Sequence, residues 1–248
     1  MMRRFRLPAL VVLAGLLSGC AADPLVGTSP PMHQSVPAEM MADNQFVVYD
    51  PWEGMNRRVY VFNALFDKYA FLPVVNAYDY AVPDPMKTGV SNFFSNLTEI
   101  RNGTNGAFQG RPEVTGRAAI RFALNSTIGV AGLFDVATPL GIPQQNEDFG
   151  QTLGRYGVGA GPYLVLPVLG PSNVRDASGL AVDTAVSGFL PPFSYVANWV
   201  YFHPTMYFLY AVNQRRSISF RYYGSGSPFE YDLVRWLYTK YREFEIRR

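Results

Sequence analysis

Residue types that do covalent chemistry are scarce in this chain of 248 residues, which holds one cysteine and two histidines. His33 lies in a stretch rich in Pro and Met, and His203 directly precedes Pro204, so a metal cluster or a histidine-assisted nucleophile lacks its side chains. Ser225 stands in a Gly-Ser-Gly-Ser run, which is not the G-x-S-x-G turn of a hydrolase. We therefore expect no enzyme activity, no metal site and no cofactor.

Acidic side chains remain as candidates for hydrolytic chemistry. Their spacing selects no pair that would work as acid and base, so a phospholipase is the least favoured interpretation of the chain. The five acids concerned are Asp135, Glu147, Asp148, Asp176 and Asp183.

Cys20 is the residue whose surroundings predict a covalent modification. The first six residues include three arginines, and an apolar run over 7–17 follows, shorter than the roughly 20 residues that span a bilayer. This order is typical of a secretory signal. Leu17-Ser18-Gly19-Cys20 resembles the lipobox of bacterial lipoproteins, so we expect removal of residues 1–19 and acylation of Cys20. An ordinary secretory signal that happens to end in cysteine is the alternative.

Two or three acyl chains on Cys20 would hold the protein on a membrane, because each buried CH₂ contributes about 0.8 kcal/mol. In bacterial lipoproteins an aspartate directly after the cysteine resembles an inner-membrane retention signal. Here Ala21 follows the cysteine and the first acid is Asp23, so we expect the outer membrane.

The composition of the mature chain excludes one class of partner and favours another. Without residues 1–19 the chain has 18 basic and 19 acidic residues, a net charge of −1. Nucleic-acid binding needs clustered Lys and Arg on one face, so we expect no nucleic-acid partner. Charged residues make up 16% of the chain, against about 25% in an ordinary soluble domain. This shortage favours a domain partly embedded in lipid over a soluble protein with a large core.

The elements that must position any site are predicted to be helices. Residues 20–49 lack periodicity and indicate a flexible tether, so the ordered domain is expected over 50–248. In Asp50-Pro51-Trp52-Glu53 an acid at the N-cap position, Pro at N1 and Glu at N3 predict a helix start. Apolar side chains then recur every three or four residues: Trp52, Met55, Val59, Phe62, Phe66 and Tyr69.

Two further helix starts repeat this design. Asp84-Pro85 precedes an apolar pattern over 90–100, and Ser227-Pro228-Phe229-Glu230 has the form of a capping box. Leu233, Leu237, Tyr241 and Phe244 form the stripe behind the second of them. A break is predicted over 125–132. Because no convincing period-two run occurs, the expected fold class is all-α.

Two long stretches carry no charged residue, 156–174 and 184–214, the second interrupted only by His203. Both contain prolines and the first is rich in glycine, so neither predicts a plain transmembrane helix. A non-helical backbone exposed to lipid leaves peptide groups without hydrogen-bond partners. Such segments therefore occur at membrane depth only where they pack against protein or line a water-filled cavity. Tyr195, Trp199, Tyr201, Tyr207 and Tyr210 supply rings that favour a membrane interface.

Several motifs together resemble one family. Asp50-Pro51-Trp52-Glu53-Gly54-Met55-Asn56-Arg57 resembles its opening D-P-[LW]-E-G-x-N-R. The stretch from Phe149 to Tyr163 resembles its block F-G-x-T-L-G-x-Y-G-V-G-x-G-P-Y. With Asn92-Phe93 and the run from Asn125 to Gly129, the resemblance extends from about Asp50 to the C-terminus. This is the VacJ/MlaA family of outer-membrane lipoproteins.

The resemblance implies a single ring-like helical domain in the inner leaflet of the outer membrane, with a central amphipathic channel, usually beside a trimeric porin. Such proteins take phospholipid that has strayed into the outer leaflet and pass it to a soluble periplasmic carrier. That carrier delivers it to an inner-membrane ABC transporter. The chain stops at Arg248 without the long polar tail of some relatives, and the resemblance does not extend to the contacts of such a tail. A structural envelope lipoprotein without lipid transport remains the alternative.

Two groups of residues are candidates for the channel. Gly157, Val158, Gly159 and Gly161 lie in the segment with most backbone freedom and are predicted to act as a hinge, unless they serve tight packing turns alone. Pro162 excludes the dinucleotide fingerprint there. Polar residues on or beside apolar stripes are predicted to form the polar wall for lipid headgroups, unless they are solvated or capping. These are Asn56, Arg57, Asn92, Asn96, Arg117, Arg121 and Asn125, in which arginine suits phosphate through its planar fork.

Overall fold

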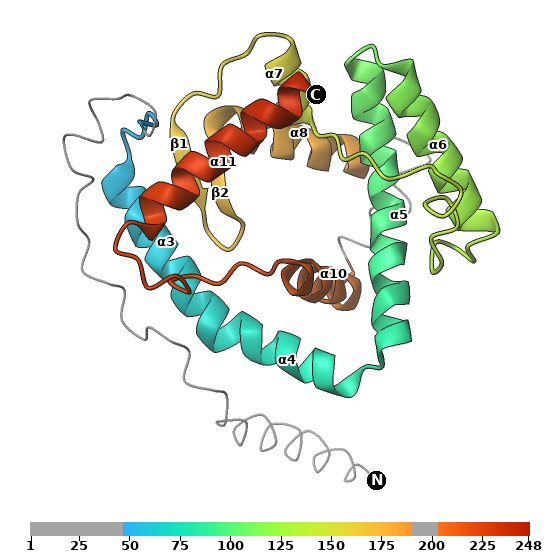
Figure 1. The fold of residues 1–248 in the computed structure, drawn as a ribbon, viewed down its shortest axis with the longest axis horizontal. Coiled ribbons are helices and arrows are strands. Elements are labelled where there is room, and N and C mark those ends of the chain that lie inside the picture. The colour runs from blue at the N-terminus through green and yellow to red at the C-terminus, as the bar shows by residue number, and fades with distance from the viewer. Residues whose placement is uncertain (1–46, 190–202) are drawn as a thin grey trace, which may run out of the picture.

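A continuous helical rod begins the part of the chain that this computed structural model describes, residues 47–189 and 203–248. Helix α3 (Glu53–Phe66), the π-helical turn η1 (Asp67–Phe71) and helix α4 (Leu72–Ala81) follow one another without a break (Figure 1). The rod ends where Val82 becomes extended, because the residue before a proline is disfavoured in the helical region. The chain then turns into the next side of a ring.

The second side of the ring is a pair of helices. Helix α5 (Asp84–Phe108) runs along it, and α6 (Pro112–Thr127) packs against the outer side of α5 (Figure 1). The start of α5 at Asp84 and the end of α6 inside the predicted break agree with the sequence prediction. A loop over 128–148 then crosses to the third side.

Two helices and a hairpin form the third side. Helix α7 (Phe149–Arg155) packs against α8 (Val174–Phe189). Between them in sequence lie strands β1 (Tyr163–Leu166) and β2 (Gly170–Asn173), which pair antiparallel with Tyr163 opposite Asn173. The tip of this hairpin points into the ring (Figure 1).

The last two described helices complete the ring. Helix α10 (Pro204–Ser217) packs on α4 and α5 and lies on the inner side of the ring, and α11 (Glu230–Arg247) packs on α7 and β2 (Figure 1). The first and last helices are joined directly, because Arg57 Nη2 of α3 lies 3.1 Å from Asp232 of α11. The Tyr60 hydroxyl likewise donates to Glu230 at 2.7 Å. The first and last described helices therefore contact each other, and this contact closes the ring.

The predicted all-α fold class is confirmed, and the structure adds one two-stranded hairpin that the sequence did not predict. Each strand has only four residues, and β2 reads Gly-Pro-Ser-Asn, which has no apolar alternation to reveal it. Such a hairpin is marginal alone and needs packing against other elements. Here β1 packs on α3 and β2 packs on α11.

The predicted cap at Asp50 was also wrong. Helix α3 begins at Glu53 with Trp52 at its N-cap position and no side-chain cap. The Asp50 carboxylate instead accepts from Asn56 Nδ2 at 2.8 Å, from the Tyr231 hydroxyl at 2.6 Å and from Arg235 at 3.0 Å. A buried carboxylate is stabilised more by a cation and tertiary donors than by one helix amide, which explains the difference.

The predicted capping box at 227–230 likewise has a different role. Helix α11 starts at Glu230, two residues later than the capping box predicts, and the Glu230 carboxylate accepts from Tyr60, Tyr223 N and the Ser225 hydroxyl. The acid therefore ties α11 to α3 and to the loop before it. At Asp84 the carboxylate pairs with Lys87 at 2.8 Å rather than capping α5.

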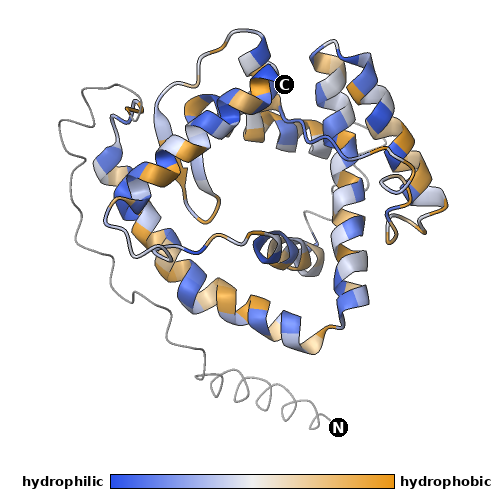
Figure 2. Ribbon diagram, viewed as in Figure 1, coloured by the Kyte–Doolittle hydropathy of each residue, from blue (hydrophilic) through white to orange (hydrophobic). Residues whose placement is uncertain are grey.

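The predicted apolar stripes face outward, and the polar faces of the same helices are buried. On α3, Phe62 is 49% exposed while Asn56 is fully buried, and on α11 Phe244 is 63% exposed while Arg242 is 8% exposed. Hydrophobic residues thus recur along the outside of the ring (Figure 2). This distribution is the reverse of an ordinary soluble protein, in which charged residues are almost never fully buried.

Within residues 47–189 and 203–248, no helix combines the length and the apolar character that crossing a membrane requires. Cys20, the tether over 20–46 and the aromatic residues Tyr195, Trp199 and Tyr201 lie outside the described residues. The predictions that concern them stay predictions.

Candidate functional site

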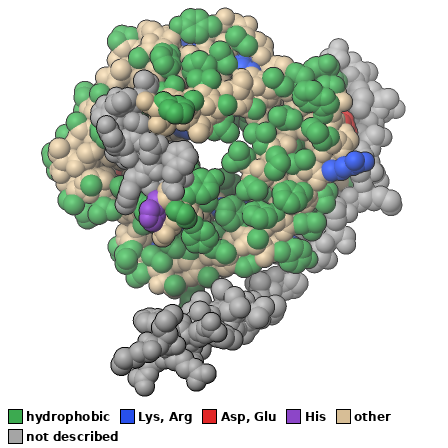
Figure 3. All heavy atoms as spheres, turned by 180° about the vertical axis from the view of Figure 1, so that it is seen from behind, with side chains coloured by type: hydrophobic (Ala, Val, Ile, Leu, Met, Phe, Trp, Pro, Cys, Tyr) green, Lys and Arg blue, Asp and Glu red, His purple; other side chains and the backbone are tan. Residues whose placement is uncertain are grey.

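An opening runs through the middle of the ring. The space-filling view shows it from behind, surrounded by a face on which hydrophobic side chains predominate and charged side chains show at only a few points (Figure 3). An aperture bordered by an apolar face is suited to molecules with hydrocarbon parts, since apolar surface leaves water most readily against apolar surface. The opening is therefore the centre of the candidate site.

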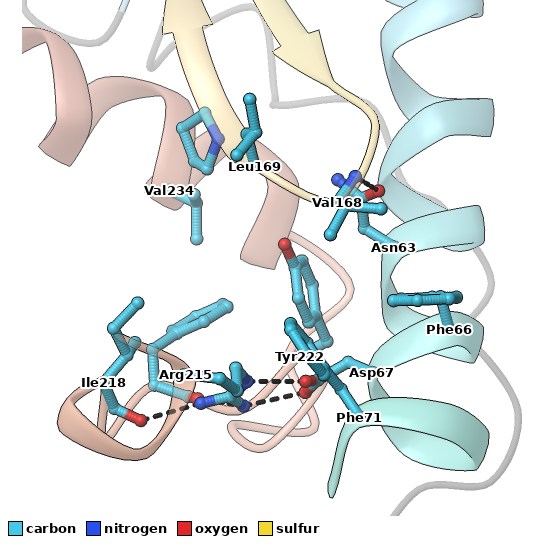
Figure 4. A pocket seen from close by; sticks show the side chains of 13 residues that line it. Asn63, Phe66, Asp67, Phe71, Val168, Leu169, Arg215, Ile218, Tyr222 and Val234 are labelled. Atoms are coloured by element: carbon cyan, nitrogen blue, oxygen red, sulfur yellow. Dashed lines mark hydrogen bonds and ion pairs between the residues drawn. The ribbon is translucent and has the colours of Figure 1, made fainter. Parts of the chain in front are cut away.

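A pocket of about 260 Å³ lies where α3 and η1 meet the hairpin tip, the stretch after α10, and α11 (Figure 4). Most of its wall is apolar, and a few polar side chains lie among it. The lining residues are Asn63, Phe66, Asp67, Phe71, Val168, Leu169, Gly170, Pro171, Arg215, Ile218, Phe220, Tyr222 and Val234.

Asn63 holds the hairpin tip at one side of this pocket. Its Nδ2 donates to Leu166 O at 2.9 Å, and its Oδ1 accepts from Val168 N at 2.7 Å. Val168 has a φ of +66°, which is rare for a β-branched residue and costs free energy. The two hydrogen bonds from Asn63 stabilise that strained tip, and Val168 and Leu169 stay exposed at the rim of the pocket.

A buried ion pair forms the opposite wall. Arg215 Nε and Nη2 donate to the two Asp67 carboxylate oxygens at 2.5 and 2.7 Å (Figure 4). The same guanidinium donates to the carbonyls of Ile218 at 2.8 Å and Phe220 at 3.0 Å. This bidentate pair fixes the π-helical turn to the end of α10, and π-helical turns are frequent at functional sites.

Two residues of the predicted polar wall bind the hairpin and α11. Asn56 Nδ2 donates to Tyr163 O at 3.1 Å and its Oδ1 accepts from Val165 N at 2.9 Å. Arg57 bonds Glu53 and Asp232, and its guanidinium lies 4.1 Å from the centre of the Tyr231 ring. These contacts assign both side chains a structural role; contact with lipid stays a prediction for them.

The other predicted wall residues lie around α5, α6 and the loop after them. Arg121 is buried and binds Glu99 at 2.5 Å, Asp135 at 3.3 Å and the Ile142 carbonyl. Asn125 accepts from the amides of Val136 and Ala137, so both residues hold the loop over 128–148. The remaining three are Asn92, which donates to Leu133 O, Asn96, which donates to Ser126, and Arg117, which is half-buried on α6.

The predicted hinge lies in the exposed loop between α7 and β1. Gly157 has a φ of +85° and Gly161 a φ of +68°, so these two positions need glycine, whereas Gly159 has no such requirement. Nothing lies within 4 Å of a Cβ placed at Gly157 or Gly159. Val158 is exposed, and its carbonyl accepts from Arg175 at 3.4 Å. The loop therefore has room to move, and hinge motion stays a prediction.

Sequence reasoning missed the charged network that joins α7, α8 and α11. Arg242 donates to Asp148 at 2.7 and 2.8 Å, to Asp176 at 2.9 Å and to Glu245 at 2.9 Å. Burial alone would raise the pKa of Asp148 and of Asp176, but the Arg242 guanidinium outweighs it and holds both pKa values below the ordinary range. The sequence does contain an indication of this network, because Arg242 lies on the face of α11 opposite its apolar stripe.

The possible hydrolytic residues are engaged in other contacts. The Asp135 carboxylate accepts from Arg121 and Asn125, Glu147 accepts from Arg111, and Asp183 accepts from Asn105 and Phe149 N. The Ser225 hydroxyl donates to Glu230. Among the described residues no group of three or more His, Cys, Asp or Glu side chains is placed to hold a metal ion.

Known proteins resemble this chain in sequence and in fold. A protein of Rickettsia conorii described as uncharacterised is 39% identical over 149 residues, which are 60% of this chain and 58% of that protein. The intermembrane phospholipid transport system lipoprotein MlaA of Escherichia coli is 37% identical over 197 residues, 78% of this chain and 70% of that protein. The chain thus spans little more than half the length of the rickettsial relative.

A solved structure described as "Structural basis for maintenance of bacterial outer membrane lipid asymmetry" matches with a TM-score of 0.65 and 32% identity. The match covers 80% of this chain and all of that one. The model of the MlaA lipoprotein family matches residues 48–245, which include the rod, the hairpin and the pocket described above. The chain therefore belongs to the MlaA lipoprotein family.

Proposed function

We propose that this protein is an outer-membrane lipoprotein that removes misplaced phospholipid from the outer leaflet and passes it to a periplasmic carrier. The reversed distribution of side chains carries the proposal, because apolar stripes on the outside of a ring with a charged interior suit contact with hydrocarbon. The name of the Escherichia coli relative and the description of the solved structure support the same activity.

The placement in the membrane rests on two features. Cys20, acylated after removal of residues 1–19, anchors the chain, and residues 20–49 form the tether to the domain over 50–248. The outward stripes of α3 and α11 then lie in the inner leaflet of the outer membrane, so the opening of the ring connects lipid with the periplasm. Helices that do not cross the bilayer bind it in this way through an apolar face.

The proposed reaction is transport without a covalent step, so no catalytic residue is assigned. Phospholipid enters through the central amphipathic channel beside a trimeric porin. A soluble periplasmic carrier receives it and delivers it to an inner-membrane ABC transporter. The glycine loop with Gly157, Val158, Gly159 and Gly161 is proposed as the hinge that changes the width of the channel.

Labelling of outer-leaflet phospholipid in a deletion strain tests the proposal. We expect phospholipid to accumulate in the outer leaflet, the cells to become sensitive to detergent, and the protein to co-purify with a porin and a lipid carrier. A structural envelope lipoprotein would leave the amount of surface phospholipid unchanged. That result would therefore refute the transport function and favour the structural alternative.

A further inference from the structure

The pocket beside the hairpin tip has a mainly apolar wall. Aromatic and branched aliphatic side chains come to it from four separate parts of the chain, and Leu169 and Val168 stand at its rim (Figure 4). The apolar members of the lining are Phe66, Phe71, Val168, Leu169, Pro171, Ile218, Phe220 and Val234. A ligand that fits this wall has a hydrocarbon surface.

The charged groups of the pocket are already neutralised. The Arg215 guanidinium forms four hydrogen bonds, two to Asp67 and one each to the carbonyls of Ile218 and Phe220. A phosphate that approached Arg215 would meet the negative charge of Asp67 and would have to break this buried bidentate pair. Arg215 therefore shapes the pocket and does not receive an anion.

The neutral polar groups are engaged as well. The Asn63 amide donates to Leu166 O and accepts from Val168 N, and it lies beside Tyr222. Burial raises the pKa of Tyr222, so its hydroxyl stays neutral over the physiological range. Among its described lining residues the pocket thus offers a lipid no free cation and no free amide, and most of the surface it offers is apolar.

The size and the rim of the pocket fit a chain-like ligand. An enclosed apolar cavity of about 150 Å³ is known to hold a benzene ring, and this pocket measures about 260 Å³. Leu169 is 66% exposed and Ile218 49% exposed at its mouth. A hydrocarbon chain entering there would cover apolar surface that is otherwise in contact with water.

We propose that this pocket binds the hydrocarbon tail of a phospholipid and excludes its phosphate, so that the lipid lies tail first between η1, the hairpin tip and α11. The inference rests on the proposed transport function and adds to it the part of the lipid that this site recognises. Headgroup contacts then belong to other parts of the ring.

The test uses the acylated full chain in bilayers with two photoreactive phospholipids, one labelled at the end of an acyl chain and one in the headgroup. Crosslinked peptides are mapped by mass spectrometry. We expect the tail probe to label the segments around 168–169 and 215–222, and the headgroup probe to leave them unlabelled. Val234→Trp fills the pocket and should reduce this tail crosslinking about tenfold, which corresponds to losing burial of about two methylene groups.

Leu233→Trp is the matched control, because Leu233 is the adjacent residue of α11 and is exposed outside the pocket lining. It should leave tail crosslinking at the pocket unchanged. Should Val234→Trp fail to fold, Leu169→Gln tests the same claim at an exposed position of the rim and should also weaken tail crosslinking.

The outcomes separate this inference from the function on which it rests. Tail crosslinks that lie elsewhere on the ring, or headgroup crosslinks at the pocket, would overturn the tail-binding site and leave phospholipid binding intact. If neither probe labels the protein at any position above background, the tail site and the transport proposal both fail.

Discussion

Arginine side chains hold the interior of this protein together. Arg121, Arg215 and Arg242 are each at most 8% exposed, and each binds at least one carboxylate and joins elements far apart in sequence. A buried ion pair adds little net stability compared with apolar residues of the same shape, but removing one partner leaves an uncompensated buried charge. The polar interior is therefore sensitive to single substitutions.

Arg242→Met should lower the free energy of unfolding by about 3–5 kcal/mol, because Asp148 and Asp176 would lose the cation that both now contact. Chemical denaturation in detergent, followed by circular dichroism, measures this change. Lys240→Met is the control, because Lys240 pairs with Glu243 at the exposed face of α11. Loss of this exposed pair should lower the free energy of unfolding by less than about 1 kcal/mol. Equal effects of the two substitutions would refute the role given to Arg242.

The depressed pKa values of Asp148 and Asp176 predict a loss of stability in acid. Both carboxyls titrate at 3.8 when unfolded and lower when folded, so their contribution is complete above that pH and is lost as pH falls through the folded pKa. Asp176→Asn should reduce the decrease in the free energy of unfolding that occurs as the pH falls. Burial raises the pKa of Asp183, whose contribution has the opposite sign, so Asp183→Asn should not reduce this decrease. Denaturation midpoints between pH 2 and pH 7 would reveal a failure of either expectation.

Gly157 and Gly159 should respond differently to the same substitution. Gly157→Ala places a side chain at a φ of +85° and should lower the free energy of unfolding by about 1 kcal/mol. Gly159→Ala places a side chain in open space at a position without a positive φ, so it should leave the free energy of unfolding nearly unchanged. Thermal unfolding measures the stability of each, and outer-leaflet phospholipid labelling measures the effect on the proposed hinge. A neutral Gly157→Ala would contradict the strain argued for this loop.

At the scale of elements, the hairpin between α7 and α8 organises the ring because both its strands are fixed to helices. Asn56 of α3 binds β1 through both atoms of its amide, and Asn63 holds the tip. An amide that pairs with a strand edge replaces a neighbouring strand, which explains why two four-residue strands persist. The buried polar face of α3 is therefore a structural feature of the hairpin.

Asn56→Ala should release the first strand from α3. The Val165 amide, which donates to Asn56 Oδ1 at 2.9 Å, should lose protection in hydrogen-exchange mass spectrometry. Asn76→Ala, at an exposed position of α4, is the control and should leave the exchange of residues 163–173 unchanged. Normal protection of Val165 in the Asn56 variant would show that the hairpin is held by other contacts.

Helix starts and stripes were predictable from the sequence, whereas the orientation of the stripes and the hairpin were not. The spacing from Trp52 to Tyr69 and from Leu233 to Phe244 predicts amphipathic helices, but periodicity does not say whether the apolar side meets a core or lipid. The predicted cap at Asp50 failed because a local pattern carries no information about Tyr231 and Arg235, far along the chain. The pocket joins four distant segments, so no local pattern could have predicted it.

At the scale of the whole molecule, the ring combines a polar, ion-paired interior with an apolar outer surface. Tyr60, Tyr163, Val165 and Tyr231 form a small aromatic core where α3, the hairpin and α11 meet, while large hydrophobic side chains remain exposed on every side of the ring that the structure describes. Exposed apolar surface of this extent marks a contact with membrane or protein. We propose that it contacts the hydrocarbon of the outer membrane.

The most direct test of this account measures where the outward stripes lie. Since Cys20 is the only cysteine and is expected to be acylated, single cysteines at Phe62 or Leu237 can carry a fluorophore in outer-membrane vesicles. We predict that brominated acyl chains quench both labels and leave a label at Asn76 unquenched. Labels at Phe62 and Leu237 that are quenched only by water-soluble reagents would contradict the proposed contact with lipid.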